Sequence, residues 1–369
     1  MNSIPNSAGF NLTGGKIGVL VLHGFTGSPV SIAPWANYLN TLGYTVSAPC
    51  LPGHGSSWQQ MNKTTWQDWY KAAEQELLEL QKKCDRVFIA GFSMGGALAL
   101  RLCQIRSSEV EGLLLLNPSI HDRRLFLKLT PLLKHFISSV KKGPTDIAAP
   151  NPIKHAYHRT PLKALDSLRK LWQIVERDLY LIDLPIMVAY SINDHAVDPE
   201  NSMTVIDNIF SVDIREVIFE NSYHNVAIDY DCEQLNTESK LFIQEVLSGE
   251  LKRGSDFNET DLVDAEFDSI VSGLSLDESS PTTYLDELDG IYEAERFKPP
   301  NPHHFILNKN QRLSLVGLTS SLVYLLAYNL TDFEILGLWP VVIGVSASVA
   351  NLIWDTARKD DDYEDGASI

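Results

Sequence analysis

A serine stands between two glycines in the segment G-F-S-M-G, which spans Gly91 to Gly95. The stretch before it, Arg86 to Ala90, is apolar like a buried strand, and the stretch after it, Met94 to Ile105, has helical spacing. Glycines on both sides of a strand-to-helix turn allow a tight elbow that lifts a serine hydroxyl above the edge of a sheet. Ser93 is therefore the candidate nucleophile, and acyl transfer is the chemistry it predicts.

A serine hydroxyl needs a base to take its proton and an acid to orient that base. In the chain order typical of such an elbow, the acid comes next and the base last. Asp194 follows the predicted strand Leu184 to Tyr190, and we interpret it as the acid. His224 follows the last predicted strand, Arg215 to Phe219, and is the candidate base. Asp198 is a rival acid, but its place at the start of the next predicted helix indicates a capping role.

Acyl transfer passes through a tetrahedral intermediate whose negative charge two preorganised backbone N–H groups can stabilise. The first predicted strand, Lys16 to Leu22, leads directly into H-G-F-T-G at His23 to Gly27. We expect the backbone N–H groups of Phe25 and Met94 to form this oxyanion hole. His23 is predicted to brace the loop rather than to act as a catalyst.

A sheet has to position these residues, and the chain offers the elements for one. Apolar runs alternate with amphipathic helical stretches in residues 1–249, which predicts a mostly parallel sheet covered by helices. Residues 117–183 interrupt this alternation and are predicted to form a small inserted helical cap. The candidates for an apolar acyl pocket are Phe25, Met94, Phe126, Leu129, Leu132, Leu133 and Trp172.

Five segments carry a more specific signal when they are taken together. They are H-G-F-T-G-S-P from His23, L-P-G-H-G from Leu51, G-F-S-M-G-G from Gly91, D-H-A-V-D-P from Asp194 and N-S-Y-H from Asn221. Over about Lys16 to Leu247 the chain resembles the serine esterases of the α/β-hydrolase fold, in particular bacterial carboxylesterases and monoacylglycerol-lipase-like enzymes. The resemblance implies that fold, a small cap and acyl esters as substrates. One departure is Tyr223, where such enzymes commonly have glycine.

Three functions are open from the sequence. The leading hypothesis is a carboxylic ester hydrolase that acts on short to medium acyl esters, monoacylglycerols among them, through an acyl-enzyme on Ser93. A thioesterase or acyltransferase would form the same acyl-enzyme from a thioester or resolve it with an alcohol. A non-catalytic membrane scaffold is a third hypothesis, although it would not need a complete set of nucleophile, base and acid.

Composition narrows the classes of partner and cofactor. The net charge of −17, from 47 acidic and 30 basic residues, argues against nucleic-acid binding, which needs clustered Lys and Arg. No dinucleotide or Walker glycine motif and no His and carboxylate cluster at metal spacing is found, so we predict no cofactor and no metal. The partner is expected to be a small-molecule or lipid ester. Four scattered cysteines and the absence of a signal peptide predict a cytoplasmic hydrolase part.

The last third of the chain has a different composition. Residues 250–302 are rich in Asp, Glu and Ser, and we expect an acidic, disordered linker there. Two uncharged stretches, Leu313 to Thr331 and Ile335 to Trp354, have nearly the length that crosses a membrane. Residues 303–369 are therefore predicted to form a transmembrane helical hairpin with an acidic tail. Basic residues flank its outer ends, which predicts that both ends face the cytoplasm. A soluble helical hairpin is the alternative.

Overall fold

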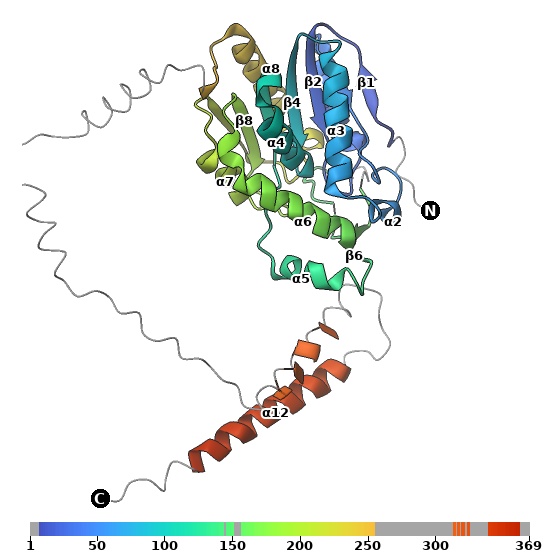
Figure 1. The fold of residues 1–369 in the computed structure, drawn as a ribbon, viewed down its shortest axis with the longest axis vertical. Helices are drawn as coiled ribbons and strands as arrows, with labels where there is room; N and C mark the ends of the chain where they lie inside the picture. The colour runs from blue at the N-terminus through green and yellow to red at the C-terminus, as the bar shows by residue number, and fades with distance from the viewer. Residues whose placement is uncertain are drawn as a thin grey trace, which may run out of the picture. The chain divides into compact units, whose positions relative to one another are not determined.

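A computed structural model describes residues 7–143, 145–150, 156–254 and 339–361. It also describes Leu313, Ser314, Val316, Gly317, 319–321, Val323 and Tyr324. The chain divides into two units, Met1–Asn258 and Glu259–Ile369 (Figure 1). From residue 255 onward, the predicted acidic linker at 250–302 lies outside the described residues.

Within the described residues, seven strands form one sheet at the centre of the first unit (Figure 1). Their order is β1-β3-β2-β4-β5-β8-β9, with β1 antiparallel to β3 and every other neighbouring pair parallel. The strands are β1 (Phe10–Leu12), β2 (Ile17–Leu22), β3 (Thr45–Ala48), β4 (Arg86–Phe92), β5 (Gly112–Leu116), β8 (Ile186–Ser191) and β9 (Ile214–Phe219). The predicted, mostly parallel sheet is confirmed, and only the three-residue edge strand β1 is too short to show a pattern in the sequence.

The central strands are apolar because helices cover both faces of the sheet. Every residue of β5 and β8 is buried, and so is every residue of β4 except Arg86. The edge strand β9 alternates instead, with only Val217 and Phe219 buried. This difference explains why continuous apolar runs predicted the inner strands well.

Eight α-helices of the first unit surround this sheet in the described residues. They are α1 (Ala33–Thr41), α2 (Trp58–Met61), α3 (Trp66–Gln81), α4 (Met94–Arg106), α5 (Leu125–Leu133), α6 (Leu162–Arg177), α7 (Glu200–Asn208) and α8 (Cys232–Ser248). Helices α1 and α8 pack together, and the indole N–H of Trp35 donates to Ser239 Oγ at 3.0 Å between them. Helices α3 and α4 pack against each other and against α6 (Figure 1).

The cap lies between β5 and β8 and is not purely helical. Besides α5 and α6 it contains a two-stranded antiparallel hairpin, β6 (Ser139–Lys141) and β7 (Arg159–Pro161). The prediction of a helical cap missed these strands because three residues cannot display a period of two. The buried carboxylate of Asp166 in α6 joins the two helices, since it accepts a hydrogen bond from Lys134 Nζ, just after α5, at 2.5 Å. An ion pair within the cap therefore connects its two helices.

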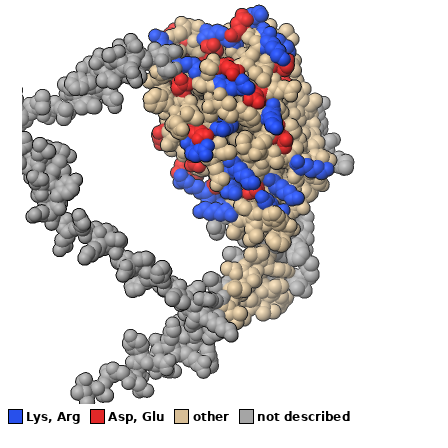
Figure 2. Space-filling model, viewed as in Figure 1, with Lys and Arg blue, Asp and Glu red and all other residues tan. Residues whose placement is uncertain are grey.

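Charges of both signs alternate over the visible face of the first unit (Figure 2). The excess of acidic residues lies elsewhere in the sequence, because Glu250 to Pro300 alone contains fourteen acidic and four basic residues. The strongly negative net charge is therefore mainly a property of the segment that follows the hydrolase-like unit.

The second unit contains the helix α12 (Trp339–Asp361). No helix in the described part of the chain is both long and apolar enough to cross a membrane. The predicted span Ile335 to Trp354 is accordingly not supported, since α12 includes Pro340 and Asn351 and continues past Trp354 into a charged end. The other predicted span, Leu313 to Thr331, lies mostly outside the described residues.

Candidate active site

The turn between β4 and α4 brings Ser93 to the carboxyl end of the sheet in a strained conformation. Ser93 has φ 56° and ψ −119°, a combination that side chains rarely adopt. The glycines around it allow this geometry, because a Cβ on Gly91 would lie 2.4 Å from the carbonyl oxygen of Gly95. A Cβ on Gly95 would lie 2.2 Å from the carbonyl oxygen of Leu22 in β2. The elbow predicted from the two glycines is therefore present for the predicted steric reason.

Three predicted residues meet in one hydrogen-bonded chain. His224 Nε2 lies 3.1 Å from Ser93 Oγ, and His224 Nδ1 lies 2.6 Å from Asp194 Oδ2. Asp194 has a side chain that is 1% exposed, and its other oxygen accepts the N–H groups of Ala196 and Val197, both at 2.8 Å. The carboxylate is thus held from two sides and can orient the imidazole.

The rival acid Asp198 lies apart from this chain of hydrogen bonds. Its carboxylate accepts the backbone N–H of Glu200 at 3.0 Å at the start of α7. This contact satisfies one of the free N–H groups of a helix N-terminus. Asp198 consequently has the capping place that its position in the sequence indicates.

The two predicted oxyanion donors flank the nucleophile. Met94 is the first residue of α4, and its N–H has no partner within the helix. Gly24 brings the loop of Phe25 close to the elbow, since a Cβ on Gly24 would lie 3.2 Å from Ser93 Cβ. Among the described residues, no group accepts a hydrogen bond from the N–H of Phe25 or of Met94. Both donors are therefore available to a substrate oxygen.

His23 is buried beneath this loop and takes the predicted bracing place. Its Nδ1 donates to the carbonyl of Gly24 at 3.0 Å, and its Nε2 accepts the N–H of Leu51 at 3.1 Å. Burial lowers the pKa of His23 to about 4, and the hydrogen bond to Gly24 opposes that shift only in part. The ring also packs edge-on against the buried His54. A neutral imidazole thus holds two loops together.

Asn117, at the end of β5, ties the loops of the candidate base and acid to the sheet. Its Nδ2 donates to the backbone carbonyl of His224 at 2.5 Å, and its Oδ1 accepts the N–H of Ser191, at the end of β8, at 2.8 Å. The side chain is buried, and the backbone has a φ of 43°. No motif in the sequence points to Asn117, whose only signal is an Asn directly after a buried strand.

Two buried carboxylates after His224 were also missed. Asp231 accepts the N–H groups of Asn221 and Ser222 at 2.9 and 2.8 Å. Asp229 accepts the N–H of Tyr223 at 3.0 Å. Together they hold the loop that precedes the candidate base through its backbone. No sequence motif announces this role, because an aspartate recognises backbone N–H groups wherever the fold places them.

Tyr223, the departure from the family pattern, has a definite contact. Its ring lies edge-on to the ring of His195, with 4.7 Å between the centroids. His195 in turn pairs with Asp146 of the cap, whose carboxylate lies 2.9 Å from His195 Nδ1. The larger side chain therefore packs on His195, while His224 keeps its contact with Asp194.

The acyl-pocket candidates differ in their placement. Met94 and Trp172 are buried, whereas Leu132 is 61% exposed and therefore does not line an enclosed pocket. The side chain of Phe126 lies outside the described residues. The candidates that are half-buried are Phe25, Leu129 and Leu133.

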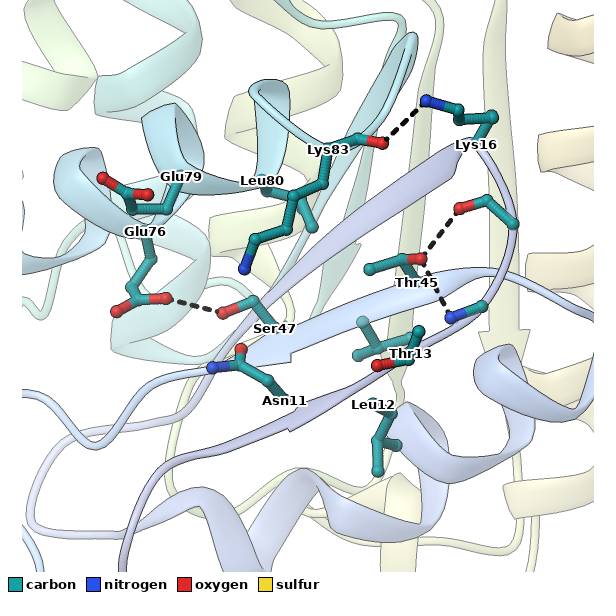
Figure 3. Close-up of a pocket in the computed structure, with 13 residues that line it drawn as sticks. Asn11, Leu12, Thr13, Lys16, Thr45, Ser47, Glu76, Glu79, Leu80 and Lys83 are labelled. Carbon is teal, nitrogen blue, oxygen red and sulfur yellow. Dashed lines mark hydrogen bonds between the residues drawn. The ribbon is translucent and has the colours of Figure 1, made fainter.

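A cavity of about 400 Å³ lies at the opposite end of the sheet, near the start of β2 and β3 (Figure 3). Two of its hydroxyl groups are engaged within the cavity wall, as Ser47 Oγ donates to Glu76 at 2.9 Å and Thr45 Oγ1 donates to the carbonyl of Gly15 at 2.8 Å. Ser93 and His224 do not line it. This cavity is accordingly separate from the candidate active site.

A serine, a histidine and an aspartate in hydrogen-bonded sequence, beside two free backbone donors, can carry out nucleophilic acyl transfer. Comparison with known proteins agrees with this chemistry. Residues 16–231, more than half of the chain, match the family described as serine aminopeptidase, S33. The chain belongs to this hydrolase family.

Curated relatives of this S33-family hydrolase include two enzymes of bacilli. A thermostable monoacylglycerol lipase of Bacillus sp. (strain H-257) is 33% identical over 224 residues, which cover 60% of this chain and 88% of the lipase. A carboxylesterase of Bacillus subtilis (strain 168) is 24% identical over 241 residues, which cover 64% of this chain and 96% of that enzyme. Neither match spans the full chain, and more than a third of the chain lies outside each of them.

A solved structure gives the same fold. The structure reported for the metagenome-derived lipolytic enzymes LipS and LipT superposes with a TM-score of 0.64 at 30% identity. The match covers 66% of this chain and 100% of the other. The S33-family hydrolase thus has the α/β-hydrolase fold that the sequence predicted.

Removal of the Asn117 side chain is expected to slow the hydrolase by about tenfold or more. Asn117→Gly keeps the backbone conformation but leaves the carbonyl of His224 and the N–H of Ser191 without this partner. Small displacements of a catalytic group lower kcat strongly. Steady-state kinetics per titrated active site measure the effect, with Asn208→Gly, an exposed asparagine of α7, as the control. An unchanged kcat in Asn117→Gly would contradict the positioning role.

Acid is expected to destabilise the hydrolase through His23. Its folded-state pKa of about 4 lies below the ordinary 6.5, so the unfolded chain binds the extra proton between these values. The free energy of unfolding should decrease as pH falls from about 6.5 to about 4, by roughly 3 kcal/mol at most from this group. Urea unfolding at several pH values measures it. The slope of the unfolding free energy against pH should be shallower in His23→Asn, by up to one proton. Equal slopes in both proteins would count against His23 as the source of this pH dependence.

Proposed function

We propose that this hydrolase cleaves carboxylic esters through an acyl-enzyme formed on Ser93. The observation that carries the proposal is the relay of Ser93 Oγ, His224 and Asp194, with separations of 3.1 and 2.6 Å. A relay of this kind serves little purpose in a protein that only binds ligand. Ser93 is buried, and the side chains of Asp194 and His224 are 1% and 15% exposed, so the electrostatic interactions of the relay are stronger than they would be in water.

The reaction has two half-reactions. His224 Nε2 takes the proton of Ser93 as the serine oxygen attacks the ester carbonyl, and the imidazolium formed is stabilised by Asp194 at its Nδ1 side. The N–H groups of Phe25 and Met94 receive the oxyanion. His224 then protonates the leaving alcohol. Water, deprotonated by the same imidazole, hydrolyses the acyl-enzyme and releases the carboxylic acid.

We place the substrates among lipid-derived esters with a single short to medium acyl chain, monoacylglycerols included. Support comes from the relative of Bacillus sp. (strain H-257), which is named a monoacylglycerol lipase and shares 33% identity. The second relative is named a carboxylesterase. The family description names an aminopeptidase, so amide hydrolysis is the rival activity to be tested.

Ser93→Ala is expected to lower kcat for p-nitrophenyl esters by roughly 10⁴ to 10⁶, because nucleophile and base act as a unit. Asp194→Asn should lower it by about 10⁴, since the imidazole loses its orienting carboxylate. The assay compares acyl chains of increasing length and adds monoacylglycerols with titration of released fatty acid. Full activity in Ser93→Ala would disprove the acyl-enzyme.

Asp198→Asn is the matched control for Asp194→Asn, because both carboxylates lie in the same loop and only Asp194 contacts His224. It should retain nearly all activity. Amino-acid p-nitroanilides, thioesters and added acceptor alcohols complete the substrate panel. Faster turnover of any of these classes than of esters would replace the proposed reaction by peptidase, thioesterase or acyltransferase activity.

We also propose that the segment 303–369 keeps the enzyme at a membrane, with the hydrolase unit on the cytoplasmic side. The support is the uncharged character of Leu313 to Thr331 and Ile335 to Trp354, together with basic residues at their outer ends. Apolar side chains of α12 are also exposed, among them Trp339 and Ile343 at 71% and 63%. Such side chains favour an apolar surrounding.

Cell fractionation is expected to find the full chain with membranes and a chain ending at Pro302 in the soluble fraction. Activity per molecule on a water-soluble ester should be the same for both, because the candidate site lies wholly in the first unit. Detection of the full chain in the soluble fraction without detergent would refute membrane association and leave the esterase proposal intact.

A further inference from the structure

The hairpin region of the cap makes two hydrogen bonds to Thr26 of the oxyanion loop. Lys142, directly after β6, donates from Nζ to Thr26 Oγ1 at 2.8 Å. Tyr157, two residues before β7, donates its backbone N–H to the carbonyl of Thr26 at 3.1 Å. The hairpin itself is closed between these two residues, since the N–H of Lys142 donates to the carbonyl of His158 at 3.0 Å. Side chain and backbone of Thr26 are thus both held from the cap.

Thr26 needs such support because its backbone is strained. Its φ is 60°, a left-handed conformation that β-branched residues rarely adopt. It is the third residue of the turn closed by the hydrogen bond from Gly27 N–H to the carbonyl of Gly24 at 3.2 Å. Glycine is the usual residue where a turn requires a positive φ at this position. Relaxation of Thr26 would reorient the peptide that it shares with Phe25 and, through the Phe25 backbone, the preceding Gly24–Phe25 peptide, whose N–H is the candidate oxyanion donor.

Tyr157 is itself held firmly in the cap. Tyr157 is 5% exposed, and its hydroxyl donates to the carbonyl of Gly53 and accepts the N–H of Ser56, each at 2.8 Å. Tyr157 therefore links the oxyanion loop to the loop after β3. Neither bond depends on the side chain of Thr26, so the backbone anchor is independent of the one from Lys142.

Lys142 has an unusual environment for a lysine. No carboxylate among the described residues lies within ion-pair distance of its Nζ, and Thr26 Oγ1 is its hydrogen-bond acceptor. Burial lowers its pKa to about 8. The side chain of Lys142 is half-buried, and the hydrogen bond to Thr26 replaces part of the hydration that its ammonium group loses. Its ammonium group is therefore placed to support the side chain of Thr26.

We propose that Lys142 and Tyr157 are positioning residues of the oxyanion hole, which hold Thr26 in its left-handed conformation and so keep the N–H of Phe25 directed at the substrate oxygen. This inference rests on the proposed esterase function. Oxyanion donors lower the barrier only when they are already oriented before charge develops. The cap is then part of the catalytic apparatus and not merely a cover over the site.

Loss of this support acts on the transition state more than on substrate binding. Lys142→Met replaces the ammonium donor by an uncharged side chain of similar length. It is expected to lower kcat for a p-nitrophenyl ester about tenfold, with KM changed less than twofold. Lys142→Arg should restore most of kcat because it keeps a charged donor. Lys141→Met, at the exposed neighbouring lysine of β6, is the matched control and should behave like wild type.

A double-mutant cycle with Thr26→Val tests whether the two residues act through one hydrogen bond. Valine has the shape of threonine and the same backbone strain but lacks Oγ1. Thr26→Val alone should reproduce the loss seen in Lys142→Met, and the double variant should be no slower than either single one. Thr26→Ser, which retains the hydroxyl, should keep most of kcat. Titration of Ser93 with a fluorophosphonate gives the concentration of active enzyme by which each rate is divided. The melting temperature of each variant shows whether it is folded at the assay temperature.

The outcomes separate the two proposals. Wild-type kcat in Lys142→Met, additive losses in the double variant, or a change in KM alone would overturn the positioning role while the esterase proposal stands. A loss fully accounted for by a smaller titrated fraction would also overturn it, since that result reports misfolding. A wild-type protein that neither hydrolyses esters nor reacts with the fluorophosphonate at Ser93 would reject the esterase proposal and this inference with it.

Discussion

The close contact between the turn at Ser93 and the end of β2 is the constraint on which the rest of the site depends. Gly95 leaves no room for a Cβ against the carbonyl of Leu22, and the loop that begins at His23 starts from that same strand end. The nucleophile and the start of the oxyanion loop are therefore brought together by close backbone packing. Side-chain chemistry is added to a geometry that the glycines and the parallel pairing of β2 with β4 already provide.

Around this contact, hydrogen bonds to buried backbone groups organise the remaining loops. Asn117 joins the ends of β5 and β8 to the loop of His224, and Asp231 holds that loop from the other side. The His224 loop accordingly has little freedom before any substrate arrives. Such preorganisation is the physical source of electrostatic catalysis, because the groups need no rearrangement when charge develops.

Much of this arrangement could be predicted from residue patterns, and particular elements show why. Inner strands such as β5 are apolar at every position, and the elbow glycines are required by sterics, so both leave a local signal. The edge strand β1 and the cap hairpin β6–β7 have three residues per strand and leave none. In the second unit, the length of an uncharged stretch was a poor predictor of a membrane span, because α12 combines such a stretch with polar residues and a charged end.

The sequence by itself determined the strand and helix alternation, the elbow and the order in which Ser93, Asp194 and His224 occur, because each depends on local sterics or periodicity. Only the tertiary structure decided that Asn117 contacts the loop of His224, that Tyr223 packs on His195 and that Lys142 reaches Thr26. These contacts join residues up to 116 positions apart in the chain. One partner is a backbone carbonyl, which every residue carries, and the others are side chains of residue types that recur along the chain, so nothing in the sequence marks these pairs in advance.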